Sequence, residues 1–253
     1  MRDFKKSVKG FDDLQTYLHL LYGDVNTGRS WDYLFGYLVR SCGFMSLNVS
    51  RAAAPEQFIR AVSWLFGLGN KLGVRVVDQY VRRFPRICYY CITAPCICFK
   101  TGKQPSPQIA AYKIQERREV SYRVIVNSAE FEKDPMSFEW LSKNVATIYP
   151  NNEVIWFHSG PWHHFTKLLE ELAELHQALS KHETGEDVIE NVGQEIADVF
   201  AWIVATWQLA IPGKDLQEEF IGHYYKGCPV CSARPVVALQ GASGDPESCR
   251  WWS

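Results

Sequence analysis

Apolar residues recur every three or four positions along most of this chain, which is the pattern of amphipathic helices. A clear case is LLEELAELHQAL, in which Leu168, Leu172, Leu175 and Leu179 share one helix face. Only SYRVIVNS (121–128) has the alternation of a strand. We therefore predict an all-α fold, with helices over 11–22, 31–47, 56–68, 73–84, 137–148, 162–182, 188–210 and 215–226.

The two halves of the chain resemble each other in three segments that occur in the same order. The matched pairs are 11–26 with 138–152, 33–44 with 163–174, and 76–91 with 216–231. Such internal similarity predicts a tandem duplication of helical hairpin units. A unit of a few helices cannot bury its apolar face alone, so we expect an intramolecular pseudo-dimer with a four-helix-bundle-like core.

The duplication divides the chain into two repeats, a connection and a tail. The connection begins with the polar, Pro-containing TGKQPSPQ, and the tail contains QGASGDPESCRWWS, which is rich in Gly and Ser. The expected parts are a first repeat over 1–100, a linker over 101–136, a second repeat over 137–232 and a flexible tail over 233–253.

Composition limits the classes of partner. The chain has 47% hydrophobic and 22% charged residues, which is ordinary for a globular protein, and a formal net charge of −1. No basic field indicates nucleic-acid binding. The start of the chain lacks the apolar segment of a secretory signal, and the apolar run 199–211 is too short to span a bilayer. We expect a cytoplasmic protein without a membrane or nucleic-acid partner, in which the pseudo-dimer can associate further into homo-oligomers.

Acidic residues border the apolar faces of two consecutive predicted helices. Glu171 and Glu174 are three residues apart, as are Glu195 and Asp198, and the polar connection 181–187 lies between the pairs. In an antiparallel hairpin the two pairs can converge. Clustered carboxylates repel one another unless a hard cation such as Mg²⁺ binds them, and Mg²⁺ in turn bridges to substrate phosphates. The alternative is a solvated helix edge, which is our interpretation of the neighbouring Glu170.

The spacing ExxE, about twenty residues, then ExxD resembles the MazG-like all-α nucleoside triphosphate pyrophosphohydrolases over about residues 160–227. KLLEELAELHQAL is similar to the first motif of this superfamily, and EIADVFAWIV is similar to the second. The resemblance implies hydrolysis of a (deoxy)nucleoside triphosphate to the monophosphate and pyrophosphate. It also implies that Mg²⁺ is bound, and the catalytic groups supplied, by Glu171, Glu174, Glu195 and Asp198.

The first half lacks the acids of both motifs. Ser41 and Phe44 stand at the first motif, and residues 60–63 contain no carboxylate at the second. We therefore expect one active site, in the second half, with the first repeat as scaffold and as one wall of a base pocket.

Substrate contacts are harder to assign from the sequence. The family often has a basic stretch near the place of HYYKGCPVC, so the candidate contacts are Lys167, His164, Lys226 and Tyr225. His163 and His164 have the simpler interpretation of a surface pair. Aromatic residues that could stack on a base, or lie in the core, are Trp156, Trp162, Phe165, Trp202 and Tyr224.

Cysteine pairs occupy equivalent places in the two halves. Cys88-x2-Cys91 and Cys228-x2-Cys231 together supply the four thiolates of a tetrahedral Zn²⁺ site, which would join the halves. A local site of Cys88 and Cys91 with Cys96 and Cys98 competes with this arrangement. Redox chemistry is a weaker interpretation, because no βαβ pattern surrounds either pair, and an iron–sulfur cluster is a minor alternative. We expect a structural zinc.

The sequence thus favours a Mg²⁺-dependent nucleotide pyrophosphohydrolase. The alternative is a non-catalytic, zinc-stabilised helical module that binds a nucleotide or a protein. Four clustered acids without a cation would be costly in such a module.

Overall fold

The computed structural model describes residues 8–49, 51, 54–105, 112–129, 131 and 136–230. All regular structure within these ranges is helical, which confirms the all-α prediction. None of the described helices is both long and apolar enough to cross a membrane. The helices are α2 (Phe11–Thr27), α3 (Trp31–Asn48), α4 (Ala54–Leu72), α5 (Val76–Arg83), α6 (Cys98–Thr101), α7 (Tyr112–Val126), α9 (Phe138–Ile148), α10 (Asn151–Ser159), α11 (Trp162–Glu183), α12 (Ile189–Ala210) and α13 (Leu216–Tyr224).

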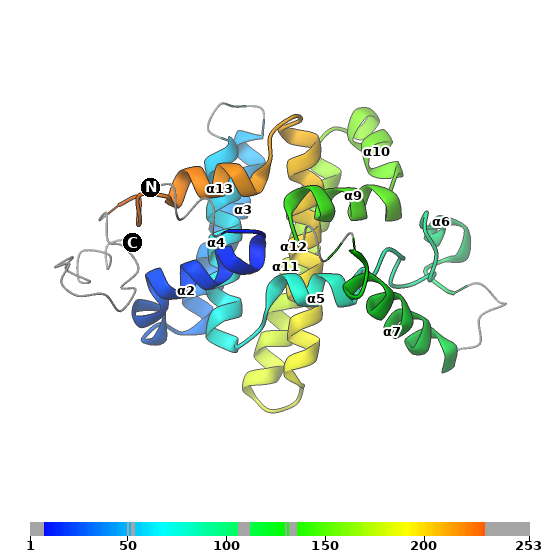
Figure 1. Ribbon diagram of the computed structural model, residues 1–253, viewed down its shortest axis with the longest axis horizontal. Helices are drawn as coiled ribbons and strands as arrows, with labels where there is room; N and C mark the ends of the chain where they lie inside the picture. Colours follow the sequence, from blue (N-terminus) through cyan, green and yellow to red (C-terminus); the bar gives the residue numbers. More distant parts are fainter. Residues whose placement is uncertain are drawn as a thin grey trace.

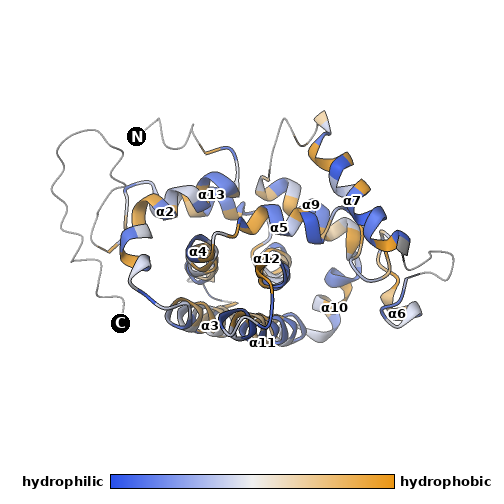
Figure 2. Ribbon diagram, turned by 90° about the horizontal axis from the view of Figure 1, so that it is seen from below, coloured by the Kyte–Doolittle hydropathy of each residue, from blue (hydrophilic) through white to orange (hydrophobic). Residues whose placement is uncertain are grey.

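The long helices form layers around a central pair (Figures 1 and 2). Seen end-on, α4 and α12 lie side by side, with α3 and α11 on one side and α2, α5, α9 and α13 on the other. The two central helices have apolar residues on most of their surface, and α12 is buried at thirteen positions between Val192 and Trp207. Helices that are apolar nearly all round belong in the core.

Each half of the chain contributes one helix that packs on the central helix of the other half. Helices α2 and α3 pack against α4, and α9 and α11 pack against α12. The next helix of each half crosses over, because α5 packs on α12 and α13 packs on α4. A Cβ atom at Gly193 would lie 2.9 Å from Cδ of Gln79, so glycine permits the close approach of α5 to α12. This crossing brings first-half residues to the acidic helices.

Three of the described helices were not expected from the sequence: the single turn α6, and α7 and α10. Part of the expected linker is α7, which also includes most of 121–128, the one segment with the alternation of a strand. The segment is helical, as the ion pair between Arg123 and Glu119, one helical turn apart, also indicates. Helix α10 has no buried residue, so no apolar face indicated it. The tail expected to be flexible lies outside the described residues.

Candidate functional site

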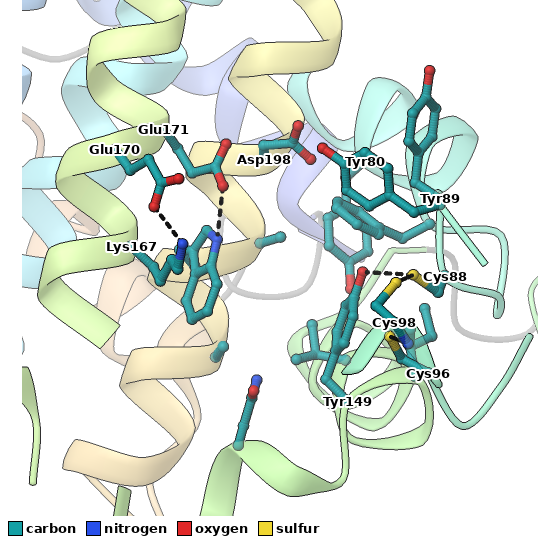
Figure 3. Close-up of a pocket in the computed structure, with 18 of the residues that line it drawn as sticks. Tyr80, Cys88, Tyr89, Cys96, Cys98, Tyr149, Lys167, Glu170, Glu171 and Asp198 are labelled. Atoms are coloured by element: carbon teal, nitrogen blue, oxygen red, sulfur yellow. Dashed lines mark hydrogen bonds and ion pairs between the residues drawn. The ribbon is translucent and has the colours of Figure 1, made fainter. Parts of the chain in front are cut away.

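A cavity of about 200 Å³ lies between the acidic helices and the segment that follows α5. Figure 3 shows Glu171 and Asp198 on one side and Tyr89, Tyr149 and the cysteines on the other. An enclosed water needs about 10–15 Å³, so the cavity holds roughly a dozen water-sized groups. Three of the four predicted acids, Glu171, Glu174 and Asp198, line this cavity.

Three of the four predicted acids converge. Glu171, Glu174 and Glu195 each place one carboxylate oxygen within 4.8 Å of the others. Oε2 of Glu195 is buried and accepts no hydrogen bond from any described residue. A buried oxygen without a partner costs about 1–3 kcal/mol, more if charged, and a bound cation would remove that cost. These residues therefore fit an oxygen-liganded cation such as Mg²⁺.

The surroundings of Glu171 and Glu195 raise the pKa values of both carboxyl groups. Burial, then the charges of Asp198 and Glu174, raise the pKa of Glu171 to about 7, although Nε1 of Trp202 donates to it at 3.3 Å. Burial, then Asp198, likewise raise the pKa of Glu195 to about 7. A carboxyl group with a pKa near 7 can accept a proton efficiently at physiological pH.

Asp198 differs from the other acids, because its carboxylate binds Arg83 of α5. The guanidinium donates to both carboxylate oxygens, with Nε at 3.1 Å from each and Nη2 at 2.6 Å from Oδ2. Burial opposes the charge of Arg83, but the attraction of Asp198 outweighs it and raises the Arg83 pKa above its ordinary value. Asp198 therefore lies in the cavity wall as half of a buried ion pair, outside the glutamate cluster.

Lysine side chains lie at the rim of the cavity. Nζ of Lys167 donates to Oε2 of Glu170 at 2.5 Å, and both residues line the cavity. Glu170, interpreted from the sequence as a solvated edge, is thus a lining residue that holds Lys167. Lys103 also lines the cavity.

His164 is not at the site mouth. Its side chain is fully buried, and its ring lies 5.1 Å from that of Trp156 and 5.5 Å from that of Trp202. Neither ring nitrogen has a hydrogen-bond partner among the described residues, and burial, then His163, lower its pKa to about 4. The structure therefore does not place His164 at the predicted substrate contact; its ring packs against the ring of Trp202, which lines the cavity.

Lys226 and Tyr225 also lie away from the cavity. Both are exposed at the end of α13, where Nζ of Lys226 lies 5.3 Å from the Tyr225 ring centre, and neither lines the cavity. The reason is the crossing of the helices, because α13 packs on α4 rather than beside the acids. The prediction of these two substrate contacts is not met.

Residues of the first half line the cavity instead. Tyr89 and Tyr90 follow α5, and the Tyr89 ring lies between the guanidinium groups of Arg83, at 3.4 Å, and Arg118, at 3.6 Å. The alignment of the halves could have indicated this contribution only if α5 had been known to pack on α12. No local motif marks these residues.

Four cysteines form a second candidate site, in the wall of the same cavity. One sulfur atom each of Cys88, Cys91, Cys96 and Cys98 lies within 4.8 Å of the others. The Sγ atoms of Cys88 and Cys98 are 3.6 Å apart, and those of Cys91 and Cys96 are 3.9 Å apart. Tetrahedral Zn²⁺ with bonds of about 2.3 Å spaces its sulfurs about 3.8 Å apart. The cluster could therefore hold a metal such as zinc.

The backbone around the cluster is arranged for thiolate ligands. N–H of Ile97 donates to Sγ of Cys91 at 3.4 Å, and N–H of Cys98 donates to Sγ of Cys96 at 3.4 Å. Ile92 has a φ of 59°, a strained conformation for a β-branched residue. Such strain persists where surrounding interactions fix the backbone, as a bound metal would do here.

The described residues therefore follow the local alternative for the cysteines. Cys228 is not part of the cluster; it lies in hydrogen-bond contact with Tyr22, and Cys231 lies outside the described residues. In the expected cross-half set of Cys88, Cys91, Cys228 and Cys231, the described Cys228 lies apart from the first two, because a tight turn gathers four nearby cysteines while α13 carries Cys228 toward α4.

The cysteine cluster and the acidic site share one cavity. Cys88, Cys96 and Cys98 line it, and Tyr149 O–H donates to Sγ of Cys88 at 3.7 Å (Figure 3). A metal bound there would fix the wall opposite the glutamates.

Comparison with protein-family models, with curated proteins and with solved structures found no match.

Proposed function

We propose that this chain is a Mg²⁺-dependent nucleotide pyrophosphohydrolase of the MazG-like type, which cleaves a (deoxy)nucleoside triphosphate to the monophosphate and pyrophosphate. The observation that carries the proposal is the convergence of Glu171, Glu174 and Glu195 beside a large cavity. Glu171 and Glu174 line this cavity, and one buried oxygen of Glu195 has no hydrogen-bond partner among the described residues. Clustered acids are common on helix surfaces. A cavity that also has cationic and aromatic walls distinguishes this cluster from such a surface.

The glutamates supply the acid–base chemistry in this proposal. Mg²⁺ held by the three glutamates would neutralise phosphate charge and activate a water molecule. In the metal-free chain, burial and neighbouring charges raise the pKa of both Glu195 and Glu171 to about 7. We assign proton transfer to Glu171, through a carboxylate oxygen that does not bind the ion. The indole N–H of Trp202 orients its carboxylate. Asp198 accepts hydrogen bonds from Arg83, and we assign it a positioning role.

The rim and the opposite wall bind the substrate. Lys167 and Lys103 bind phosphate oxygens as point charges, and Glu170 holds Lys167 toward the cavity. The rings of Tyr90 and Tyr149 offer apolar faces for a base or sugar. Zinc bound by the four cysteines would stabilise the backbone of this wall.

The duplication also belongs to this proposal, and the spacing of buried positions supports it. Residues 34, 38, 42 and 45 of α3 are buried at the same spacing as 164, 168, 172 and 175 of α11. Equivalent hydrogen bonds support it as well: Tyr17 O–H donates to the Tyr224 carbonyl at 3.0 Å, and the Asn144 amide donates to the Phe84 carbonyl at 2.8 Å. We infer a pseudo-dimer whose C-terminal helices are exchanged.

The test is release of pyrophosphate in Mg²⁺ from a panel of nucleoside and deoxynucleoside triphosphates. Glu174→Gln should lower turnover at least about 100-fold, whereas Glu183→Gln, at an exposed position of the same helix away from the cavity, should retain activity within a few-fold. Absence of turnover together with absence of Mg²⁺ binding would refute the proposal. Nucleotide binding without turnover would favour the non-catalytic module.

A further inference from the structure

A second, smaller cavity lies in the first half of the chain. It has a volume of about 50 Å³ and is lined by Tyr22, Asn26, Arg29, Arg60, Ser63, Trp64 and Tyr224. At about 10–15 Å³ per enclosed water it holds a few water-sized groups, which is the size of a phosphoryl group and too small for a nucleoside.

This cavity repeats the construction of the larger one. Arg60, Ser63 and Trp64 have the same spacing in α4 as Asp198, Ala201 and Trp202 in α12, and each set lines its own cavity. The resemblance extends to the helix that crosses over from the other half. Tyr224 of α13 lines the small cavity, and Phe84, at the end of α5, lines the large one. The small cavity is thus the first-half counterpart of the acidic site.

The charge of the two cavities is opposite. Arginine stands at position 60, where the counterpart is Asp198, and no carboxylate is among the described lining residues of the small cavity. Ser41 and Phe44 stand where the acidic site has Glu171 and Glu174. An anion would therefore meet the guanidinium groups of Arg29 and Arg60, the second of which is paired with Glu56 just outside the lining residues.

Local contacts hold both arginines at this cavity. Nη1 of Arg29 donates to Oδ1 of Asn26 at 3.1 Å, and its guanidinium lies 4.7 Å from the ring centre of Tyr33. Nη2 of Arg60 donates to Oε1 of Glu56 at 2.6 Å. A guanidinium has five N–H donors in a fixed fork, so it can bind an anion in addition to a neighbouring side chain.

Hydroxyl groups and an aromatic stack complete the walls. Oγ of Ser63 and the hydroxyl of Tyr224 lie 2.8 Å apart, and the ring of Trp64 stacks on Tyr37 at 4.7 Å with an interplanar angle of 24°. Tyr37 occupies the place that Lys167 has in α11, so a second aromatic ring replaces a lysine. The small cavity is therefore lined by hydrogen-bond donors and has no carboxylate among its described lining residues.

We propose that this recess is a metal-independent binding site for a phosphoryl group, held by Arg29 and Arg60. The group is either free phosphate or the phosphate of a nucleoside monophosphate, whose remaining atoms would lie outside over the aromatic rim. The site does not depend on the activity proposed for the acidic cavity, because it uses none of the same residues.

Titration calorimetry on the whole chain in EDTA, at constant ionic strength, tests the site with inorganic phosphate, AMP and adenosine. Phosphate and AMP should bind and adenosine should not; tighter binding of AMP would assign the nucleotide as the source. Arg29→Gln and Arg60→Gln should each weaken binding roughly tenfold or more, the effect of losing a charged hydrogen bond. Arg123→Gln, at an exposed position of α7, is the matched control and should leave binding unchanged.

Glu174→Gln separates the two cavities, because it should leave the EDTA-resistant binding intact. Absence of phosphate and AMP binding would overturn the proposal. Equal binding by folded Arg29→Gln and Arg60→Gln variants would do the same, as would a requirement for Mg²⁺. Failure of the pyrophosphate assay with arginine-dependent phosphate binding retained would refute only the proposed activity.

Discussion

Arg83 and Asp198 form a buried ion pair that joins the two halves of the chain. The arginine belongs to the first half and the aspartate to the second, and their side chains are 7% and 10% exposed. The sequence resemblance implied Asp198 as a metal ligand. In the structure its oxygens accept hydrogen bonds from a guanidinium instead, so one cationic group of the site is supplied by the protein itself.

The first prediction concerns the stability of this pair. Arg83→Met should lower the free energy of unfolding by about 3–5 kcal/mol, because it leaves the Asp198 charge buried without a partner. Urea denaturation monitored by circular dichroism measures the change. Arg82→Met is the matched control, since Arg82 pairs with Asp78 on the exposed side of the same helix and should cost at most about 1 kcal/mol. Equal losses of unfolding free energy in the two variants would show that the buried pair stabilises the fold no more than the exposed pair does.

The second prediction concerns pH. Glu171 has a pKa of about 7 in the folded protein against an ordinary value of 4.5, so the unfolded chain ionises first as the pH rises. The stability contribution of its raised pKa is fully present below about pH 4.5 and is lost as the pH rises to about 7. Urea midpoints of the metal-free protein should therefore fall less over this range in Glu171→Gln than in wild type.

Glu170 and His164 affect stability with the opposite pH dependence, because the pKa of each is lowered rather than raised. Lys167, by its hydrogen bond, lowers the pKa of the exposed Glu170, so Glu170 loses its contribution as the pH falls. His164, whose pKa is about 4, also makes the native state less stable as the pH falls below 6.5. Glu170→Gln should therefore not reduce the loss of stability between pH 4.5 and 7. A profile for Glu171→Gln parallel to wild type would contradict the assigned pKa.

The third prediction concerns zinc. The purified chain should contain about one zinc, and Cys91→Ser should lose it and lower the thermal midpoint by roughly 5–10 °C, because metal binding contributes directly to folding. Elemental analysis and calorimetry give both quantities. Cys42→Ser changes a buried cysteine of α3 outside the cluster, and should retain the metal. Zinc retained by Cys91→Ser, or absent from wild type, would argue against this site.

The fourth prediction concerns the hydrogen bond from Trp202 to Glu171. Trp202→Phe removes a donor that favours the ionised carboxylate, so the pKa of Glu171 should rise. The acidic limb of the kcat/KM profile should move to higher pH by up to about one unit. Trp156→Phe is the control, because Trp156 packs on His164 as Trp202 does but has no recorded bond to the glutamates. An unshifted limb in Trp202→Phe would exclude Glu171 as the proton acceptor.

The sequence by itself determined the helices and the pairing of the acids. Periodicity identified eight of the helices because each buries an apolar face that repeats with the helical period. Glu171 and Glu195 were predicted to meet because short spacing along a helix and a short polar connection are local properties. Helices α6, α7 and α10 were missed because few or none of their residues are buried, and burial creates the pattern.

Only the tertiary structure decided which distant residues complete the site. Periodicity reports the faces of a helix but not its neighbour, so the crossing of α5 onto α12 could not be read from it. That crossing gives Asp198 its partner Arg83 and lines the cavity with first-half tyrosines, while α13 carries Lys226 and Cys228 elsewhere. The tertiary structure also favours the local cysteine cluster over the cross-half set. A turn of a few residues closes at a smaller entropic cost than a contact between distant segments.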